Sequence, residues 1–466
     1  MKTEITFYGG THTIGGVVMS VVYGNERVLL EIGTAYNPAT DIYDGTVQKR
    51  NERYLFDELT LGRVPRINGL YSKKDIQEYP LISCEDSDLH TSIFITHMHL
   101  DHMSCMGLVG DNVDVYLSEP AQRLEAALET VGQGVHTLRN AGYKVLDPNK
   151  EYKIGEITIK PFLLNAKSYQ DYSFYVTTPD LKLHYTGDLM MHGDYKQQVI
   201  DEMNYVKAQK PDVLVCECTT FMDSTMKMMY DSADAEVKGN PELPEGMLSK
   251  DMVDEELYKK LEALNGLCVF NYYEREMSEV EVFSEMARKS GRCIAFEPET
   301  AYLVWKFFNK PVNVYVPDCD VFHADWYQEL ISNNTVITKE EIWNNPRGYL
   351  IQNTYKYSME LFDLPSTNAS YLHSGGTPIG EFDPAFKNLQ RIIELAGFTH
   401  INFFMNNYFT HAYPSQVKYY CDEIDAKVLI PTHGNNPERL LPKSGVQLIP
   451  EVGVTYVFDG EKLVRE

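Results

Sequence analysis

The chain has 466 residues, which is more than a single hydrophobic core usually organises, so we expect two globular units. A hydrophobic fraction of 43% and a charged fraction of 23% are typical of globular proteins and exclude a disordered chain. Lys and Arg number 42 against 67 Asp and Glu, and the net charge of −25 argues against a broad nucleic-acid surface while leaving room for a local basic channel.

Targeting signals and disulfides are not expected. No stretch is apolar over the roughly 18 to 20 residues that a membrane span needs, and the first residues lack the layout of a signal peptide. The eight cysteines are scattered without a CxxC pair, which is typical of reduced thiols. We therefore expect a cytoplasmic protein that makes no membrane contact. A homo-oligomer is also expected, although no motif specifies it.

The N-terminal part is expected to begin as an antiparallel sheet. Short strands are predicted at residues 4–8, 17–23 and 27–32, because alternating apolar runs are separated by glycine-rich and Asn-containing turns. A mixed excursion with short helices is predicted over residues 45–90. The apolar strand 92–95 follows it.

The next hundred residues alternate between strands and helices. A helix is predicted at residues 119–131, among strands at residues 113–117, 157–160, 173–177, 182–185 and 213–215. This pattern predicts a layered α/β fold, in which loops collect functional residues at strand ends.

Residues 222–400 differ in character and are predicted to form a second, smaller domain. Their alternation implies a parallel sheet, with elements predicted at residues 254–264 (helix), 268–272 (strand), 278–289 (helix), 293–296 (strand) and 300–308 (helix). After residue 400 the chain is predicted to continue as strand 401–405, helix 415–424 and strand 428–431.

A cluster of metal-ligand residue types follows the strand 92–95. Three of the thirteen histidines fall within six residues, in the motif Thr96-His97-Met98-His99-Leu100-Asp101-His102. In an extended chain, His97, His99 and Asp101 project to one side, and His102 at the turn into a helix can serve a second centre. Imidazole and carboxylate are the usual ligands of zinc and similar ions, so this motif predicts a metal site.

Further motifs lie later in the chain, and together they resemble the metallo-β-lactamase superfamily. Thr186-Gly187-Asp188 resembles the strand-end aspartate that bridges two metals in that superfamily. The stretch 212–220, which contains Glu217, resembles the acidic first motif of the β-CASP group. The motifs around His411 and His433 resemble its two histidine motifs, and their 22-residue spacing fits one helix and one returning strand.

The resemblance covers most of the chain and implies a fold. Residues 1–221 and 401–466 would form a metallo-β-lactamase αββα sandwich, and residues 222–400 an inserted β-CASP α/β domain. The implied cofactor is one or two Zn²⁺ ions, with Mn²⁺ as an alternative. The implied catalytic residues are Asp101, His411 and Glu217, and the implied metal ligands are His97, His99, Asp101, His102, Asp188 and His433.

The activity that the resemblance implies is hydrolysis of a phosphodiester by metal-activated water. Ribonuclease J and related RNA-processing nucleases belong to this group, so single-stranded RNA or another phosphodiester is the expected partner. Two alternatives remain open. The protein is either a degenerate family member that binds metal or ligand without turnover, or a hydrolase of a small non-nucleic ester, amide or phosphate.

The chain departs from the family pattern at Ala166, where a histidine ligand is usual. Alanine cannot bind metal, so the half-site of His97 and His99 lacks one protein ligand. Three explanations are open: a weak or missing second ion beside a site of Asp101, His102, Asp188 and His433; a degenerate protein; or a substitute ligand such as His12, Asn165 or Lys167.

Two smaller features complete the pattern. Glu31 stands where the family usually has an aspartate that supports the metal loop. The glycine-rich stretch 373–377 is either a backbone cradle for phosphate or a turn between domains.

Overall fold

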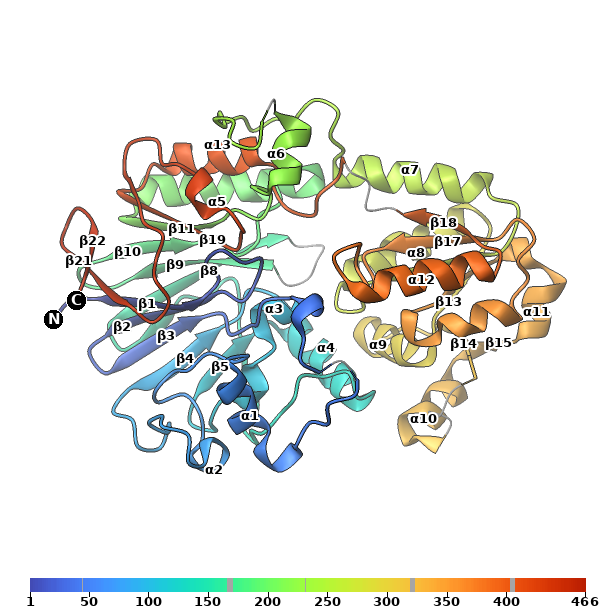
Figure 1. Ribbon diagram of the computed structural model, residues 1–466, viewed down its shortest axis with the longest axis horizontal. Coiled ribbons are helices and arrows are strands. Elements are labelled where there is room, and N and C mark those ends of the chain that lie inside the picture. Colours follow the sequence, from blue (N-terminus) through green and yellow to red (C-terminus); the bar gives the residue numbers. More distant parts are fainter. Residues whose placement is uncertain (44, 166–170, 231, 319–322, 403–406) are drawn as a thin grey trace.

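The computed structural model describes residues 1–466 apart from 44, 166–170, 231, 319–322 and 403–406. It is a mixed α/β structure, and its described strands form sheets of eight, seven, five and two strands. The two largest sheets build one body, here called the sandwich, and the other two build a second body beside it (Figure 1). No helix in the described part is both long and apolar enough to span a membrane.

The eight-stranded sheet begins with the antiparallel strands β1, β2 and β3, as the sequence predicts. From β3 onward the neighbouring strands β4, β5 and β6 run parallel. In spatial order its strands are β22 (Leu463–Arg465), β21 (Thr455–Phe458), β1 (Glu4–Gly9), β2 (Val18–Tyr23), β3 (Glu26–Leu30), β4 (His90–Phe94), β5 (Asp114–Leu117) and β6 (Lys144–Val145).

The seven-stranded sheet brings distant parts of the sequence together. Strands β10, β11 and β19 run parallel, so their carboxyl ends meet at one edge. In spatial order its strands are β20 (Val446–Gln447), β19 (Val428–Thr432), β11 (Val213–Glu217), β10 (Lys182–Tyr185), β9 (Asp171–Thr177), β8 (Ile157–Asn165) and β7 (Tyr152–Ile154).

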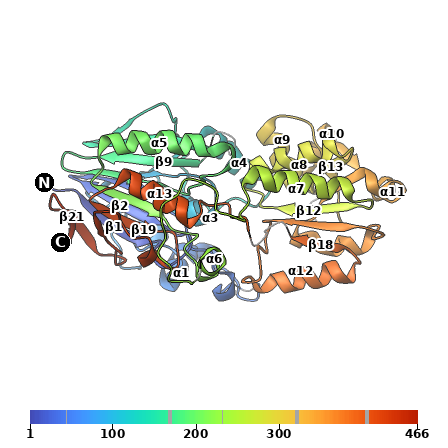
Figure 2. The same cartoon turned by 90° about the horizontal axis from the view of Figure 1, so that it is seen from above.

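Alternating apolar residues hold the layers of the sandwich together. In β11, Val213 and Val215 belong to the core between the two large sheets, whereas Leu214 and Cys216 pack on the outer side. Every second side chain of a strand faces the same way, so one strand serves both cores. The outer core of the seven-stranded sheet is covered by α5 (Lys196–Gln209) and α13 (Pro414–Ile424) (Figure 2).

Helices also cover the outer face of the eight-stranded sheet. Apolar side chains of α1 (Tyr54–Leu61), α2 (Lys73–Ile76), α3 (Leu100–Met103) and α4 (Glu119–Thr130) pack with those of β3, β4 and β5. The sandwich therefore has four layers, with helices outside and two sheets inside.

The second body is built on a parallel sheet, as predicted, and is here called the parallel-sheet unit. Its strand order is β13 (Cys293–Ala295), β16 (Tyr349–Gln352), β12 (Cys268–Tyr272), β17 (Ser370–Ser374) and β18 (Thr399–Asn402), and every neighbouring pair is parallel. Strands β14 (Asn313–Tyr315) and β15 (Thr335–Ile337) form the two-stranded sheet beside it.

Helices lie on both faces of this parallel sheet (Figure 2). The helices α8 (Met277–Lys289) and α9 (Pro298–Phe308) pack on one face, and α12 (Pro384–Leu395) packs on the other. The remaining helices of the unit are α7 (Lys250–Ala263), α10 (Asp325–Asn333) and α11 (Lys339–Asn344); α6 (Asp223–Met229) precedes them.

A buried ion pair joins the two bodies. Arg275 donates from Nη1 to Glu125 Oε2 of α4 at 3.1 Å, and from Nη2 to the carbonyl oxygen of Gln133 at 2.9 Å. Both charged side chains are buried, at 6% and 1% exposure. Because a buried charge is stable only with its partner, this contact fixes the segment before α8 against the sandwich.

Replacing Arg275 with alanine is expected to lower the free energy of unfolding by about 3 to 5 kcal/mol, since the buried Glu125 carboxylate would lose its counter-charge. Urea unfolding followed by circular dichroism measures the loss. Arg288→Ala is the control, because its pair with Glu285 is exposed to solvent and is expected to contribute little to stability. Equal losses in the two variants would contradict the expectation.

Candidate metal centre

The predicted site residues lie in loops at one edge of the sandwich. His97 and His99 follow β4, and Asp101 and His102 lie on the short helix α3. The neighbouring parallel strands bring the remaining residues to the same edge: Asp188 after β10, Glu217 at the end of β11, His433 after β19 and His411 just before α13. Loops at the carboxyl ends of parallel strands therefore assemble the site.

Two histidines and two aspartates lie close together at this edge. His102 Nε2 lies 3.2 Å from His433 Nε2, 3.5 Å from Asp101 Oδ2 and 3.4 Å from Asp188 Oδ1. His433 Nε2 lies 3.2 Å from the same Asp101 oxygen and 3.6 Å from the same Asp188 oxygen. Ligands about 2.0 to 2.1 Å from a tetrahedral zinc ion stand about 3.3 to 3.4 Å apart. Each of these five separations is close to that value, and the ligand atoms of Asp101, His102 and His433 all lie within 4.8 Å of one another.

The charges of this group also fit a cation. Asp188 Oδ1 is buried and has no hydrogen-bond partner, although a buried carboxylate oxygen normally has one. Burial opposes ionisation of Asp101, yet His102 and His433 hold its pKa well below the usual range. Burial likewise opposes protonation of His102, yet Asp188 and Asp101 raise its pKa to about 10. The site therefore stabilises positive charge, which a divalent ion would supply.

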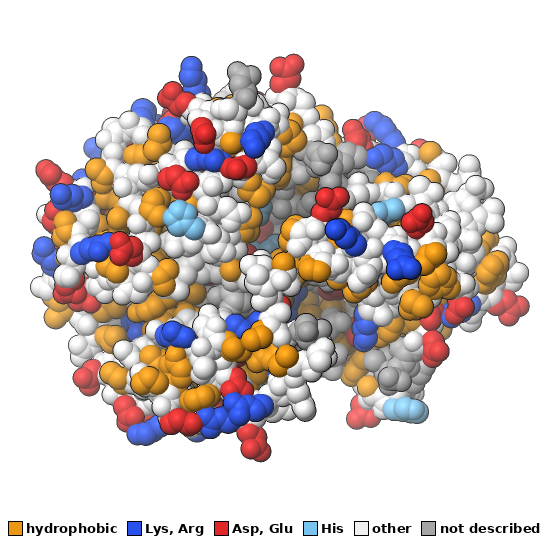
Figure 3. Space-filling view, viewed as in Figure 1, with side chains coloured by type: hydrophobic (Ala, Val, Ile, Leu, Met, Phe, Trp, Pro, Cys, Tyr) orange, Lys and Arg blue, Asp and Glu red, His pale blue; other side chains and the backbone are white. Residues whose placement is uncertain are grey.

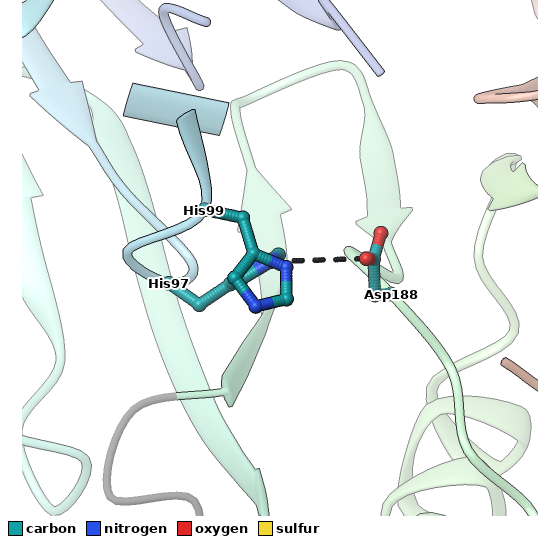
Figure 4. Close-up of side chains that lie close together, drawn as sticks. All are labelled: His97, His99 and Asp188. Atoms are coloured by element: carbon teal, nitrogen blue, oxygen red, sulfur yellow. Dashed lines mark ion pairs between the residues drawn. The ribbon is translucent and has the colours of Figure 1, made fainter. Parts of the chain in front are cut away.

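A second group shares Asp188. His97 Nε2 lies 3.7 Å from Asp188 Oδ2, and the rings of His97 and His99 are 4.4 Å apart (Figure 4). Burial, together with the nearby His102 and His99, holds the pKa of His97 well below its usual value, so its imidazole is neutral and able to bind metal. Asp188 thus turns one oxygen toward each group.

Of the residues considered as substitute ligands, His12 is the one whose side chain the structure describes, and it is not in the group of His97, His99 and Asp188. His12 is exposed in the glycine-rich bend, and its recorded ion pair is with Glu438 at 3.9 Å. Ala166 and Lys167 lie outside the described residues, as does the side chain of Asn165.

Two threonine hydroxyl groups contact the Nδ1 atoms of two site histidines. Thr96 Oγ1 lies 2.9 Å from His97 Nδ1, and Thr219 Oγ1 lies 2.8 Å from His433 Nδ1. Both contacts leave Nε2 turned toward the site. Such outer partners fix the ring orientation and tautomer of a metal-binding histidine.

Glu31 supports the third histidine. Its carboxylate is fully buried; Oε1 accepts a hydrogen bond from Thr96 N at 3.0 Å, and Oε2 lies 3.7 Å from His102 Nδ1. Burial raises the pKa of Glu31. Its φ of +67° is in the left-handed region, so the backbone turns sharply just after β3 to bring the carboxylate under the metal loop.

Glu217 and His411 form a hydrogen-bonded pair beside Asp188. His411 Nδ1 lies 3.1 Å from Glu217 Oε1 and 3.8 Å from Asp188 Oδ2. Leu189 N donates to Glu217 Oε1 at 2.6 Å, and the Thr219 hydroxyl donates to Oε2. Asp188, Glu217 and His411 lie close enough together to hold an ion. However, the Glu217 carboxylate already accepts hydrogen bonds from Leu189 N and the Thr219 hydroxyl. We therefore interpret Glu217 as the residue that orients the His411 imidazole, and not as a ligand of a third metal ion.

The site opens into a long hollow of about 2670 Å³, lined by both bodies. Figure 3 shows the molecule hollowed between them. His97, His99, Asp101, Asp188 and His411 line it from the sandwich, and Lys250, Tyr273, Glu276, Ser374 and Thr377 line it from the parallel-sheet unit.

Two cationic side chains at the wall of the hollow are paired with carboxylates. Lys250 Nζ lies 2.9 Å from Glu279 and 2.5 Å from Asp254. On the sandwich side, Arg63 pairs with Glu58 and Asp41. These cations are therefore already neutralised within the protein.

Sequence reasoning assigned no role to Thr96, Thr219 or Glu276, all of which contact predicted site residues. The two threonines could have been found, since each stands within two residues of a predicted site residue. Glu276 carried no such signal, because it lies on the other body.

No protein-family model matches this chain, and no curated protein does. A solved protein of unknown function from Enterococcus faecalis V583 is 24% identical, with a TM-score of 0.76, over 98% of this chain and 100% of that chain. The whole fold therefore occurs in a second protein.

Two more distant structures carry metallo-β-lactamase names. The metallo-β-lactamase fold protein YhfI from Bacillus subtilis is 14% identical, with a TM-score of 0.28, over 48% of this chain and 76% of its own. BJP-1, a subclass B3 metallo-β-lactamase of Bradyrhizobium japonicum, is 13% identical, with a TM-score of 0.27, over 45% of this chain and 73% of its own.

Proposed function

We propose that this protein is a metal-dependent hydrolase of the metallo-β-lactamase type. The observation that carries the proposal is Asp188, whose Oδ1 faces His102 and His433 and whose Oδ2 faces His97, at the wall of an open hollow. Zn²⁺ is the preferred ion and Mn²⁺ the alternative, since imidazole and carboxylate ligands suit both.

The proposed architecture is a sandwich of residues 1–221 and 401–466 interrupted by a β-CASP domain at residues 222–400. The sheet order supports it: β11 and β19 are hydrogen-bonded neighbours, yet the whole parallel-sheet unit lies between them in the sequence. An insertion at a loop beside the active edge explains why that unit faces the site.

The proposed reaction is hydrolysis of a phosphodiester. A bound metal would supply Lewis acidity and lower the pKa of a water molecule. His411, held by Glu217, would donate a hydrogen bond or proton to a substrate oxygen. Burial opposes its protonation, but Glu217 and Asp188 raise the pKa of His411 to about 9, so the donating form is present at neutral pH. His411 also reaches the hollow, where a substrate would enter.

The alternative substrate is a small ester, amide or phosphate that is not a nucleic acid. Lys250 and Arg63 favour it, because both line the hollow and both are already paired with carboxylates. Binding a long polyanion draws on cations that are free to meet phosphates. Single-stranded RNA therefore remains a candidate that a substrate panel decides.

Removing the metal is expected to abolish activity. Protein purified without chelator should contain one to two equivalents of zinc or manganese, measured by mass spectrometry of the metal content. Hydrolysis of bis(4-nitrophenyl) phosphate, end-labelled single-stranded RNA and a small ester should fall to background after chelator treatment and return when Zn²⁺ or Mn²⁺ is added. The hydrolase proposal fails if the purified protein is metal-free or if the stripped protein keeps its full rate.

The panel also separates the substrate classes. Cleavage of the RNA together with the aryl phosphodiester supports the phosphodiesterase, and cleavage of the small ester alone supports the alternative. Metal binding without turnover of any substrate would indicate the degenerate form.

A further inference from the structure

The buried histidines of the site share one orientation. His97, His102 and His433 each turn Nε2 toward the site and Nδ1 toward an outer partner. All three partners belong to the sandwich, and they are Thr96, Glu31 and Thr219.

His99 differs in where its partner comes from. Its Nε2 lies 3.5 Å from Glu276 Oε2, on the residue just before α8 of the parallel-sheet unit. Among the described residues, His99 is the member of this group with which Glu276 forms an ion pair. The ring of Tyr273, from the same segment, packs edge-on against His99 at 5.2 Å.

We propose that Glu276 is the positioning residue of His99, so that the second metal-binding half-site is completed across the hollow by the parallel-sheet unit. The inference rests on the metal centre of the proposed function but not on hydrolysis. A carboxylate at Nε2 favours the tautomer that carries hydrogen there, and that tautomer leaves the Nδ1 lone pair for a metal.

Glu276 is itself held in place. The Ser278 hydroxyl donates to Glu276 Oε1, and Glu276 N donates to Tyr273 O at 2.8 Å. The preceding residue, Arg275, is anchored to Glu125 of the sandwich. The Glu276 carboxylate is therefore already in position before metal binds. Its position depends on how the two bodies pack against each other.

This half-site is the one that needs such support. Within the described residues it has three candidate ligands, His97, His99 and Asp188, and Asp188 also faces the other group. Each of these ligands then contributes a large share of the binding affinity. A poorly oriented His99 should therefore weaken binding of the second ion more than binding of the first.

Glu276→Gln tests the proposal. Glu279→Gln, in the first turn of α8, is the matched control, because Glu279 pairs with Lys250 rather than with a histidine. Zn²⁺ is titrated into chelator-stripped protein in competition with a chromophoric chelator, which resolves two dissociation constants. Glu276→Gln should raise the weaker constant about 10- to 100-fold and leave the tighter one unchanged. The control should change neither.

Ser278→Ala provides a second variant, because it releases the Glu276 carboxylate without removing it and should weaken the same ion by a smaller factor. Melting of the stripped proteins by circular dichroism shows that each variant is folded. Long-range ¹H–¹⁵N spectra of histidine-labelled stripped protein should show His99 as the Nε2–H tautomer in the wild type and as a mixture in Glu276→Gln.

Three outcomes would overturn the positioning role: unchanged constants in folded Glu276→Gln, equal weakening of both ions, or a wild type that binds one ion only. Weaker binding of the second ion in Glu276→Gln, beside a wild type that binds two ions but hydrolyses nothing, would support the positioning role while the hydrolase proposal fails. Full hydrolysis with unchanged metal constants in Glu276→Gln would do the reverse.

Discussion

Replacing Asp188 with alanine is expected to leave the protein with no tightly bound metal and no measurable hydrolysis. One carboxylate serves both groups: Oδ1 faces His102 and His433 at 3.4 and 3.6 Å, and Oδ2 faces His97 at 3.7 Å. Since a catalytic metal contributes several kcal/mol of transition-state stabilisation, the rate should fall by at least about 10³-fold. Metal analysis and the phosphodiester assay measure the two losses separately.

Asp254→Asn is the matched control for this variant. Asp254 also lines the hollow, but it pairs with Lys250, and within the described residues it forms no ion pair with a predicted ligand. It should keep the metal content and most of the activity. An Asp188→Ala protein with a wild-type metal content would contradict the assignment of Asp188 as the shared ligand.

The local elements of the fold were largely accessible from the sequence, because each depends on nearby residues. The predicted helix 254–264 is present but begins four residues earlier, as α7 (Lys250–Ala263). Ser249 accepts a hydrogen bond from Met252 N and so caps that start, which is a signal that the sequence carries. The predicted helix 300–308 likewise begins earlier, at Pro298, a favoured first residue of a helix.

Strand β8 shows why a local rule falls short. The strand predicted at residues 157–160 continues to Asn165, past Pro161, a residue that usually ends a strand. In the structure β7 pairs only with residues Ile157–Ile159, so beyond them β8 has a ladder on one side, with β9. Proline has no backbone N–H to donate, and this loss costs little where a strand has no neighbour on that side. Which parts of β8 have a neighbour is set by the tertiary structure.

The sequence predicts only part of how the site residues come together. The motif at residues 97–102 is contiguous, and its ligand chemistry can be read directly. Its meeting with Asp188 and His433 depends on β10, β11 and β19 being neighbours, which the spacing allows but does not require. Glu276 could not be placed at all, because its approach to His99 depends on how two separately packed bodies dock.

Replacing His411 with alanine is expected to lower the rate about 10²- to 10³-fold while the metal content is retained, because one well-placed donor contributes that much to a hydrolytic transition state. His411 hydrogen-bonds Glu217 at 3.1 Å and lies 3.8 Å from Asp188, outside the group of Asp101, His102 and His433. Loss of the side chain should therefore remove a donor to the substrate and spare the ion. Steady-state kinetics and metal analysis of the same preparation measure both.

The pH dependence gives this assignment a second, independent readout. Burial lowers the pKa of His411, but Glu217 and Asp188 raise it to about 9 in the absence of metal, and a cation on Asp188 would oppose that rise. The protonated form is the donor, so the His411 contribution should be lost as pH increases, with a midpoint no higher than about 9. That descending limb should be absent in His411→Ala and present in His90→Ala, whose exposed imidazole pairs with Glu26. Full activity in His411→Ala, or an unchanged alkaline limb, would show that the proton donor lies elsewhere and that the Glu217–His411 pair serves only to hold the loop.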